Sequence, residues 1–218
     1  MTERKVTVPG ARLAVHDFGG GPPLVLLHAH VVNSWAWEPL TPFLLDAGYR
    51  VVAFDHRDCG DSTTEAVEYS SRDDVIAVLD ALGFGQAVLI GNSNGAQVAL
   101  ETAVEYPQRV AALDAIGAAV GGWYPTPTPQ ESAIDAELEA LAGSADPEAI
   151  ADADVRAWVD GPGQSSVRVP EDIREVVREM DRVNADPERV KGRPVRLDPP
   201  AAARVEALMM PVLAIAGE

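Results

Sequence analysis

The sequence has 218 residues, of which 47% are hydrophobic and 23% are charged. This length accommodates one globular domain with a substantial core, or one domain that carries an inserted subdomain. Its 17 Lys and Arg residues against 34 Asp and Glu residues give a net charge of −17, which argues against nucleic acid and anionic membrane as partners. The single cysteine, Cys59, excludes an internal disulfide and a cysteine-built zinc or iron–sulfur site.

Membrane and secretion signals are not apparent in the sequence. No stretch reaches the roughly 18 apolar residues that a membrane span requires. The first residues, Met1–Lys5, are followed by alternating valine and threonine rather than by the apolar core of a signal peptide. We therefore expect a soluble cytoplasmic protein.

The first two thirds of the sequence alternate strand-like and helix-like segments, a pattern typical of a mostly parallel sheet covered by helices. The continuous apolar run Leu24–His28 predicts a strand buried on both faces. The helix expected after Ser70 or Ser71 has Asp73 and Asp74 in its first turn. In chain order, the expected strands are 5–8, 12–18, 24–28, 50–54, 87–90 and 110–116, and the expected helices are 38–47, 70–82 and 94–106.

The composition of the sequence changes after Ala119. Residues 121–129 are rich in glycine and proline, and the chain from Gln130 to about Pro200 has the pattern of short acidic helices without a strong strand. We expect this insertion, residues 121–200, to form a helical cap, with 1–120 and 201–218 forming the sheet-bearing core. The apolar segment 208–216 is the last expected strand, again a buried one.

The motif that carries chemistry is Gly91-Asn92-Ser93-Asn94-Gly95, which lies between a predicted buried strand and a predicted helix. A serine on a sharp strand-to-helix turn adopts a strained backbone, and the two glycines remove side chains that would clash there. The turn lifts the Ser93 hydroxyl above the carboxyl edge of the sheet and places a helix N-terminus under any oxyanion that forms. The alternative is a glycine-rich turn with a solvated serine, which the flanking strand and helix disfavour.

The sequence resembles the α/β-hydrolase superfamily over nearly its whole length. Leu24–His30 is similar to the family's strand that ends in His-Gly-x, whose third residue lends a backbone N–H to the oxyanion hole. Phe54–Ser62 is similar to the Asp-x-Arg-Gly-x-Gly-x-Ser loop, Gly91–Ala96 to the nucleophile elbow, and Tyr106–Val110 to the usual helix-to-strand link. The resemblance implies a mostly parallel α/β-hydrolase sheet flanked by helices, with the insertion in the place of the family's cap.

The sequence also departs from the family's pattern. Ala29 and Asp58 stand where glycine is usual. In the family, the triad acid follows the strand that corresponds here to 212–216, where Gly217-Glu218 resembles the start of that turn, and the triad histidine comes later still. None of the four histidines follows Ser93. We therefore expect a core that is incomplete at its C-terminus and lacks the triad acid and histidine.

The histidines before Ser93 are weak substitutes for that base. His28, at a strand end, has the place of a packed structural residue, and His30 approaches the serine from the oxyanion side. His28-x-His30 lacks the following Asp-His pair and the distant histidines of a hydrolytic zinc site, so no metal is expected. Asp114 lies inside a predicted strand rather than at its end, which makes it a poor triad acid.

The resemblance implies acyl transfer to water on a carboxylic ester or a lactone, without a cofactor. Ser93 would be the nucleophile, the backbone N–H groups of Asn94 and His30 would hold the oxyanion, and a histidine outside this chain would take the proton. A serine in place of an aspartate argues against the epoxide-hydrolase and haloalkane-dehalogenase branches. The alternative is a truncated or degenerate hydrolase-fold protein that at most binds small apolar ligands.

The last expected strand also suggests a partner. We expect it at or near the sheet edge, apolar, uncharged and without a neighbour on one side. Such an edge is a template for pairing with another chain, so self-association through this strand is expected. The other expected partner is a small-molecule ester or lactone.

Overall fold

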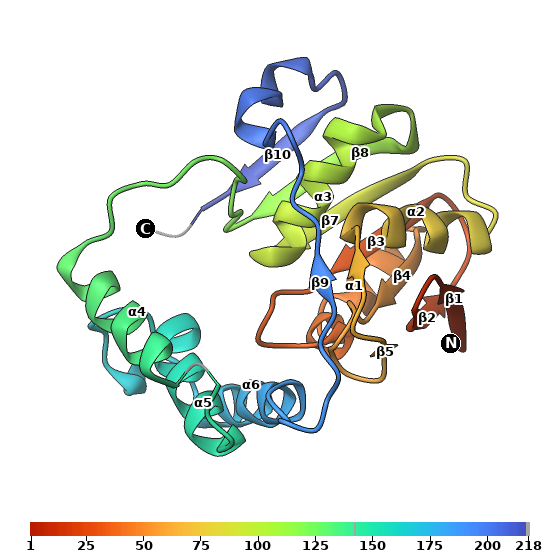
Figure 1. Cartoon of the computed structure of the whole chain (residues 1–218). Helices are drawn as coiled ribbons and strands as arrows, with labels where there is room; N and C mark the ends of the chain where they lie inside the picture. The colour runs from red at the N-terminus through yellow and green to blue at the C-terminus, as the bar shows by residue number, and fades with distance from the viewer. Residues whose placement is uncertain (142, 217–218) are drawn as a thin grey trace. The chain divides into compact units, whose positions relative to one another are not determined.

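The computed structural model describes residues 1–141 and 143–216, which form two compact units. The larger unit, Met1–Tyr124 with Lys191–Glu218, carries the main sheet, and the smaller unit, Pro125–Val190, is helical (Figure 1). The sequence suggested boundaries after residues 120 and 200. The structure assigns residues 191–200 to the larger unit, because β9 (Arg193–Pro194) pairs with β6 (Glu68–Tyr69).

A mostly parallel sheet runs through the larger unit (Figure 1). Within the described residues its strand order is β1-β2-β4-β3-β7-β8-β10, and the short β5 pairs with β2. Strands β4, β3, β7, β8 and β10 pair in parallel, whereas β1 and β2 join the edge antiparallel. The strands are β1 (Thr2–Val8), β2 (Ala11–Phe18), β3 (Pro23–Leu27), β4 (Arg50–Phe54), β5 (Thr63–Thr64), β7 (Ala87–Asn92), β8 (Val110–Ile116) and β10 (Val212–Ile215).

Helices cover both faces of the sheet, and β3 shows why the sequence requires this. Leu24 and Leu26 belong to a buried cluster that α1 and the preceding turn cover, whereas Val25 and Leu27 belong to the cluster under α2 and α3. All four side chains are buried, so the prediction of a strand buried on both faces is confirmed. The helices and helical turns of this unit are η1 (Ser34–Trp37), α1 (Thr41–Asp46), α2 (Ser71–Ala81), α3 (Asn94–Glu105), η2 (Pro107–Arg109), η5 (Ala201–Ala203) and η6 (Val205–Ala207).

The start of α2 follows the predicted capping chemistry. The Ser70 side chain accepts a hydrogen bond from the Asp73 backbone N–H at 3.2 Å, so Ser70 is the N-cap. Asp73 and Asp74 occupy the first turn, where negative charge is favourable. After the helix, Gly83 adopts φ 72°, a conformation that glycine accommodates at a helix end. This end was also predicted.

The helix expected at 38–47 differs from the structure. Only its later part is helical, because α1 spans Thr41–Asp46, and the 3₁₀ turn η1 (Ser34–Trp37) lies before the expected range. Proline has no N–H, so Pro39 and Pro42 cannot donate to the carbonyls four residues earlier. The Leu40 N–H instead bonds to the Trp37 carbonyl at 3.1 Å, which is the tighter spacing of a 3₁₀ turn.

The strand expected at 208–216 is shorter than predicted, and it is not buried. Strand β10 spans only Val212–Ile215, and the side chains of Val212, Leu213 and Ile215 are 45–57% exposed. Within the described residues β10 pairs only with β8, so it is the last strand in the sheet order. The expectation of burial is therefore wrong, whereas the expected edge position agrees with the topology. The turn suggested at Gly217-Glu218 lies outside the described residues.

The smaller unit consists of helices and helical turns, as the sequence predicts for this segment. Asp146 caps one of them by accepting from the backbone N–H groups of Glu148 and Ala149. None of the helices in the described ranges is long and apolar enough to cross a membrane. The elements of the unit are α4 (Pro129–Leu141), α5 (Pro147–Asp154), the π-helical turn η3 (Val155–Asp160), η4 (Ser166–Arg168) and α6 (Glu171–Asn184).

Candidate active site

Ser93 lies on the turn between β7 and α3, and its backbone is strained. Its φ of 50° and ψ of −113° fall outside the regions that a non-glycine residue ordinarily adopts. The surrounding structure fixes this conformation. The Ser93 N–H donates to the Ile116 carbonyl at the end of β8 at 2.8 Å, and the Ser93 carbonyl accepts from the Gln97 N–H at 3.0 Å.

The two glycines of the motif allow this turn to pack closely. A Cβ at Gly91 would lie 2.3 Å from the Gly95 carbonyl oxygen. A Cβ at Gly95 would lie 2.1 Å from the Leu27 carbonyl oxygen at the end of β3. Both contacts are with backbone atoms, which cannot swing aside as a side chain can. The steric reason for a glycine at each position is therefore backbone-to-backbone contact.

The Ser93 hydroxyl makes no capping hydrogen bond to α3, and within the described part of the chain it has no hydrogen-bond partner. Asn94, the next residue, is the first residue of α3. The N–H groups of a helix's first turn have no acceptor within the helix and carry its positive dipole end. The elbow thus places a hydroxyl and free backbone donors side by side in the chain.

The loop that contains His30 begins next to this elbow. Strand β3 pairs with β7, with Leu27 opposite Gly91, and the Gly95 backbone approaches both Leu27 and His28. His30 follows three residues after the end of β3 and is exposed. The structure therefore places the start of this loop, Leu27 and His28, against the turn that carries Ser93.

His28 packs as a structural residue. Its Nδ1 lies 2.7 Å from the Ala29 carbonyl oxygen, and its Nε2 accepts the His56 backbone N–H at 2.9 Å. Because a carbonyl oxygen can only accept, Nδ1 carries the proton and the ring is neutral. Burial lowers the pKa of His28, which favours the same neutral form. The ring thereby joins the end of β3 to the loop after β4.

Asp55 organises the same region, and the sequence analysis gave it no role of its own. Its Oδ1 accepts the Ser34 N–H and its Oδ2 accepts the Asp61 N–H, each at 2.8 Å. A Cβ at Gly60 would lie 2.3 Å from Oδ2, so glycine is required there. Asp55 therefore ties the His30 loop to the loop after β4. Only the resemblance to a family motif could have drawn attention to it, since Ser34 is distant in sequence.

Asp114 lies inside β8, opposite Ile90 of β7 and Leu213 of β10. Desolvation raises the pKa of its carboxyl group. The residue is two positions before Ile116, whose carbonyl meets the Ser93 N–H. Its position within the strand is as the sequence indicated. No group of three or more His, Cys, Asp or Glu side chains suited to a metal ion occurs within the described ranges.

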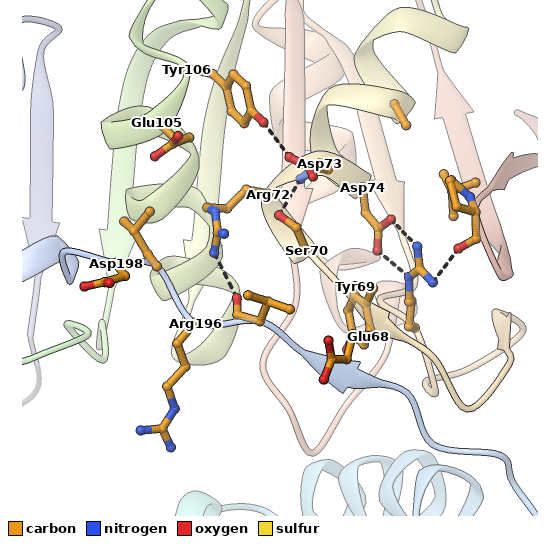
Figure 2. Close-up of a pocket in the computed structure, with 16 residues that line it drawn as sticks. Glu68, Tyr69, Ser70, Arg72, Asp73, Asp74, Glu105, Tyr106, Arg196 and Asp198 are labelled. Carbon is orange, nitrogen blue, oxygen red and sulfur yellow. Dashed lines mark hydrogen bonds and ion pairs between the residues drawn. The ribbon is translucent and has the colours of Figure 1, made fainter.

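A separate cleft of ≈650 Å³ lies on the larger unit beside the first turn of α2, the end of α3 and residues 195–198 (Figure 2). Two buried arginines in its lining are paired. Arg57 bonds to both carboxyl oxygens of Asp74, and Arg72 bonds to Glu101. Ser93 is not among the residues that line this cleft. The cleft is therefore built around buried ion pairs and is separate from the turn that carries Ser93.

A family model described as alpha/beta hydrolase fold matches residues 22–158 of the sequence. This match covers more than half of the chain, and the observed strand order, elbow and flanking helices agree with it. The chain belongs to the alpha/beta hydrolase fold family.

Curated relatives within this family differ in their named reactions. The chain is 37% identical over 123 residues to 2-hydroxymuconate semialdehyde hydrolase of Pseudomonas sp. (strain CF600), a match that covers 53% of this chain and 43% of that protein. It is 34% identical over 128 residues to bifunctional epoxide hydrolase 2 of Sus scrofa, covering 56% of this chain and 23% of that protein. The chain thus matches less than half the length of either relative.

Solved structures share the fold over almost the whole chain. One of them, Est816, described as an N-acyl homoserine lactone degrading enzyme, is 25% identical and has a TM-score of 0.71. The likeness covers 99% of this chain and 82% of that one. Hydrolases, esterases and lactonases therefore share this architecture, and the reaction of this chain has to be argued from its own residues.

Proposed function

We propose that the larger unit carries the nucleophile and the oxyanion donors of a serine hydrolase that acts on a carboxylic ester or a lactone. The strained Ser93 backbone is the observation that carries the proposal. Strain of this kind persists only where the surrounding structure imposes it, and it clusters at active sites. Here Gly91, Gly95 and Ile116 impose it through backbone contacts. The consequence is a serine hydroxyl with no structural hydrogen bond to break.

In the proposed reaction, Ser93 Oγ attacks the carbonyl carbon of the substrate and forms a new C–O bond. The carbonyl electron pair moves to oxygen, and the Ser93 proton passes to a base. The N–H of Asn94, at the positive end of α3, and the N–H of His30 would hold the oxyanion. Collapse of the tetrahedral intermediate breaks the C–O bond to the alcohol, which takes the proton back from the base. Water then gives a proton to the same base and attacks the acyl-enzyme, which releases the acid and restores the Ser93 hydroxyl.

The base is the part of the reaction that the described residues do not provide. His28 is neutral and bonded on both ring nitrogens, and the rings of His16 and His56 are engaged with Trp35 and His28. His30 lies on the oxyanion loop. The proposal therefore assigns proton transfer to a histidine outside these residues.

The choice of an ester or a lactone depends on the nucleophile. A serine forms an acyl-enzyme with a carbonyl substrate, whereas the sequence resemblance associates epoxide and haloalkane chemistry with an aspartate at this position. Solved structures described as an esterase and an enol-lactonase share this fold, and activated C–C bonds are a further substrate class that a serine nucleophile can attack. We propose that the smaller unit is a cap that selects among such substrates.

A second candidate function is a hydrolase-fold protein that binds small apolar molecules without turnover. The observation that favours it is the absence of a hydrogen-bonded base on Ser93 within the described part of the chain. The two candidates differ in what Ser93 does. Only the first requires the Ser93 hydroxyl to form a covalent bond.

The test compares hydrolysis of a short-chain p-nitrophenyl ester by the 218-residue chain, by Ser93→Ala and by the control Ser132→Ala on the exposed face of α4. We expect rates close to background for all three, since sites without a triad base retain only about 10³–10⁴-fold over water. In a longer form that supplies the histidine, a fluorophosphonate should label Ser93. Labelling that survives Ser93→Ala would overturn the assignment.

The cap assignment has its own test in the same longer form. Replacing residues 125–190 with a short Gly/Ser linker should change the preference between short and long acyl chains while leaving fluorophosphonate labelling of Ser93 largely intact. Loss of cooperative folding in this variant would show that the smaller unit is part of the core rather than a cap.

A further inference from the structure

Asp58 is unusual because it is a non-glycine residue with a left-handed backbone. Its φ is 69°, and among the described residues only Ser93 shares this property. Glycine adopts such a conformation without steric cost, and aspartate tolerates it less well. The turn after β4 therefore keeps a side chain where a glycine would relieve strain, which points to a role for the carboxylate.

The Asp58 carboxylate bonds to a segment that is distant in sequence. It accepts the Gly192 N–H at 3.1 Å through Oδ2 and at 3.3 Å through Oδ1. Gly192 is the second residue after Val190, where the smaller unit ends. Asp58 thus bonds to the start of residues 191–200, which we name the return segment.

The backbone of Gly192 is also confined on another side. A Cβ at this position would lie 2.7 Å from Cε1 of Tyr69. The Tyr69 ring in turn lies over the Arg57 guanidinium at 4.4 Å, and Arg57 is bonded to Asp74 of α2. Figure 2 shows the return segment crossing beside Tyr69 and Glu68. The contact point is therefore anchored to α2 through buried groups.

Hydrogen bonds continue along the return segment from this point. The Arg193 N–H donates to the Val67 carbonyl at 2.9 Å, and the Val195 N–H donates to the Tyr69 carbonyl at 2.7 Å. The Val195 carbonyl accepts from Arg72 at 3.2 Å. Just beyond the return segment, the Ala202 N–H donates to the Gly121 carbonyl at 2.9 Å. Gly121 lies four residues before the start of the smaller unit at Pro125.

We infer that Asp58 is a positioning residue that latches the return segment to the larger unit, and so fixes one of the two chain connections of the smaller unit. Its role in substrate selection rests on the proposed assignment of the smaller unit as a cap. The latch itself is a property of the larger unit alone. Removing it should loosen residues 192–195 together, because their hydrogen bonds follow one another along the same strand.

Hydrogen–deuterium exchange of the whole 218-residue chain tests the latch with two variants. Asp58→Gly removes the carboxylate and also relieves the left-handed strain, whereas Asp58→Asn keeps an acceptor oxygen and tolerates the same backbone. We expect exchange at 193–195 to rise about tenfold or more in Asp58→Gly, the factor for a lost hydrogen bond to a charged group. Asp58→Asn should stay within about threefold of the parent, and the midpoint of thermal unfolding should be unchanged in both.

Trypsin cleavage after Lys191 gives a second readout, and it should accelerate in Asp58→Gly but not in Asp58→Asn. Gly192→Ala keeps Asp58 and pushes against Tyr69, so it should loosen the same segment. Faster exchange at Gly192 alone, with 193–195 unchanged, would overturn the latch, because Asp58 would then cap a single N–H. None of these measurements depends on Ser93, so failure of the proposed hydrolase activity is distinguishable from failure of the latch.

Discussion

Each of the two units of the chain is stabilised internally by a different kind of interaction. In the larger unit, side chains such as Leu26, Phe54 and Leu89 are fully buried in two apolar clusters. The fully buried apolar residues of the smaller unit are small, and its longest helix, α6, carries a row of paired arginines. The stabilisation that comes from burying apolar side chains is nearly independent of salt, whereas salt screens exposed ion pairs and weakens them. The larger unit should therefore resist salt better than the smaller one.

The largest expected effect is the loss of a core side chain from the larger unit. Leu89 is fully buried, so Leu89→Ala should lower the free energy of unfolding of this unit by about 3–5 kcal/mol. Urea unfolding monitored by hydrogen exchange separates the two units. The control is Ile173→Ala on α6, where the side chain is 49% exposed and the cost should stay below about 1 kcal/mol. If both variants lost the same free energy of unfolding, the proposed difference between the two units would be wrong.

Next in size is the ion pair between Arg174 and Asp160 in the smaller unit. The side chains are 13% and 4% exposed and lie 3.0 Å apart. Arg174→Ala leaves a buried carboxylate without its main partner, and we expect a loss of about 3 kcal/mol in this unit. The double variant Arg174→Met/Asp160→Leu, which removes both charges, should recover most of that loss. No recovery would mean that packing rather than charge sets the cost.

Mild acid should destabilise the larger unit, because His28 and His56 lie in it. Burial lowers the pKa of His28 and that of His56 below the usual 6.5. This contribution to stability is complete above pH 6.5 and is lost as the pH falls toward the lowered pKa of the folded state. The free energy of unfolding should therefore fall progressively as the pH drops below 6.5. His28→Gln should flatten the pH dependence of unfolding, and an unchanged slope would contradict the assignment.

The smallest effect concerns an exposed pair. Arg182 bonds to Glu179 at 2.7 Å, with side chains 38% and 59% exposed. Arg182→Ala should lower the stability of the smaller unit by only about 0.3–0.5 kcal/mol at low salt. In 1 M NaCl the difference between variant and parent should vanish, since the Debye length is then about 3 Å. A difference that persists in salt would indicate packing of the arginine stem.

The sequence was most informative where a pattern repeats or where one residue type is required by local geometry. The apolar run of β3 predicted burial on both faces, and the glycines around Ser93 predicted a tight turn. The roles of Asp55 and Asp58 were missed because each depends on a partner far away in the chain, which leaves no periodic signal. The oxyanion roles of His30 and Asn94 stay predictions. The exposure of β10 was missed for a related reason, since an apolar composition does not show what covers a strand.

The pairing of β8 with β10 has a consequence for the order of folding. Leu113 pairs with Val212, and the whole smaller unit lies between them in the chain. Closing such a long loop costs conformational entropy before any strand contact is gained. If the inserted helices fold first, fewer residues of the loop remain disordered and that cost is reduced. During synthesis, β10 then joins strands that precede it in the chain and have already left the ribosome.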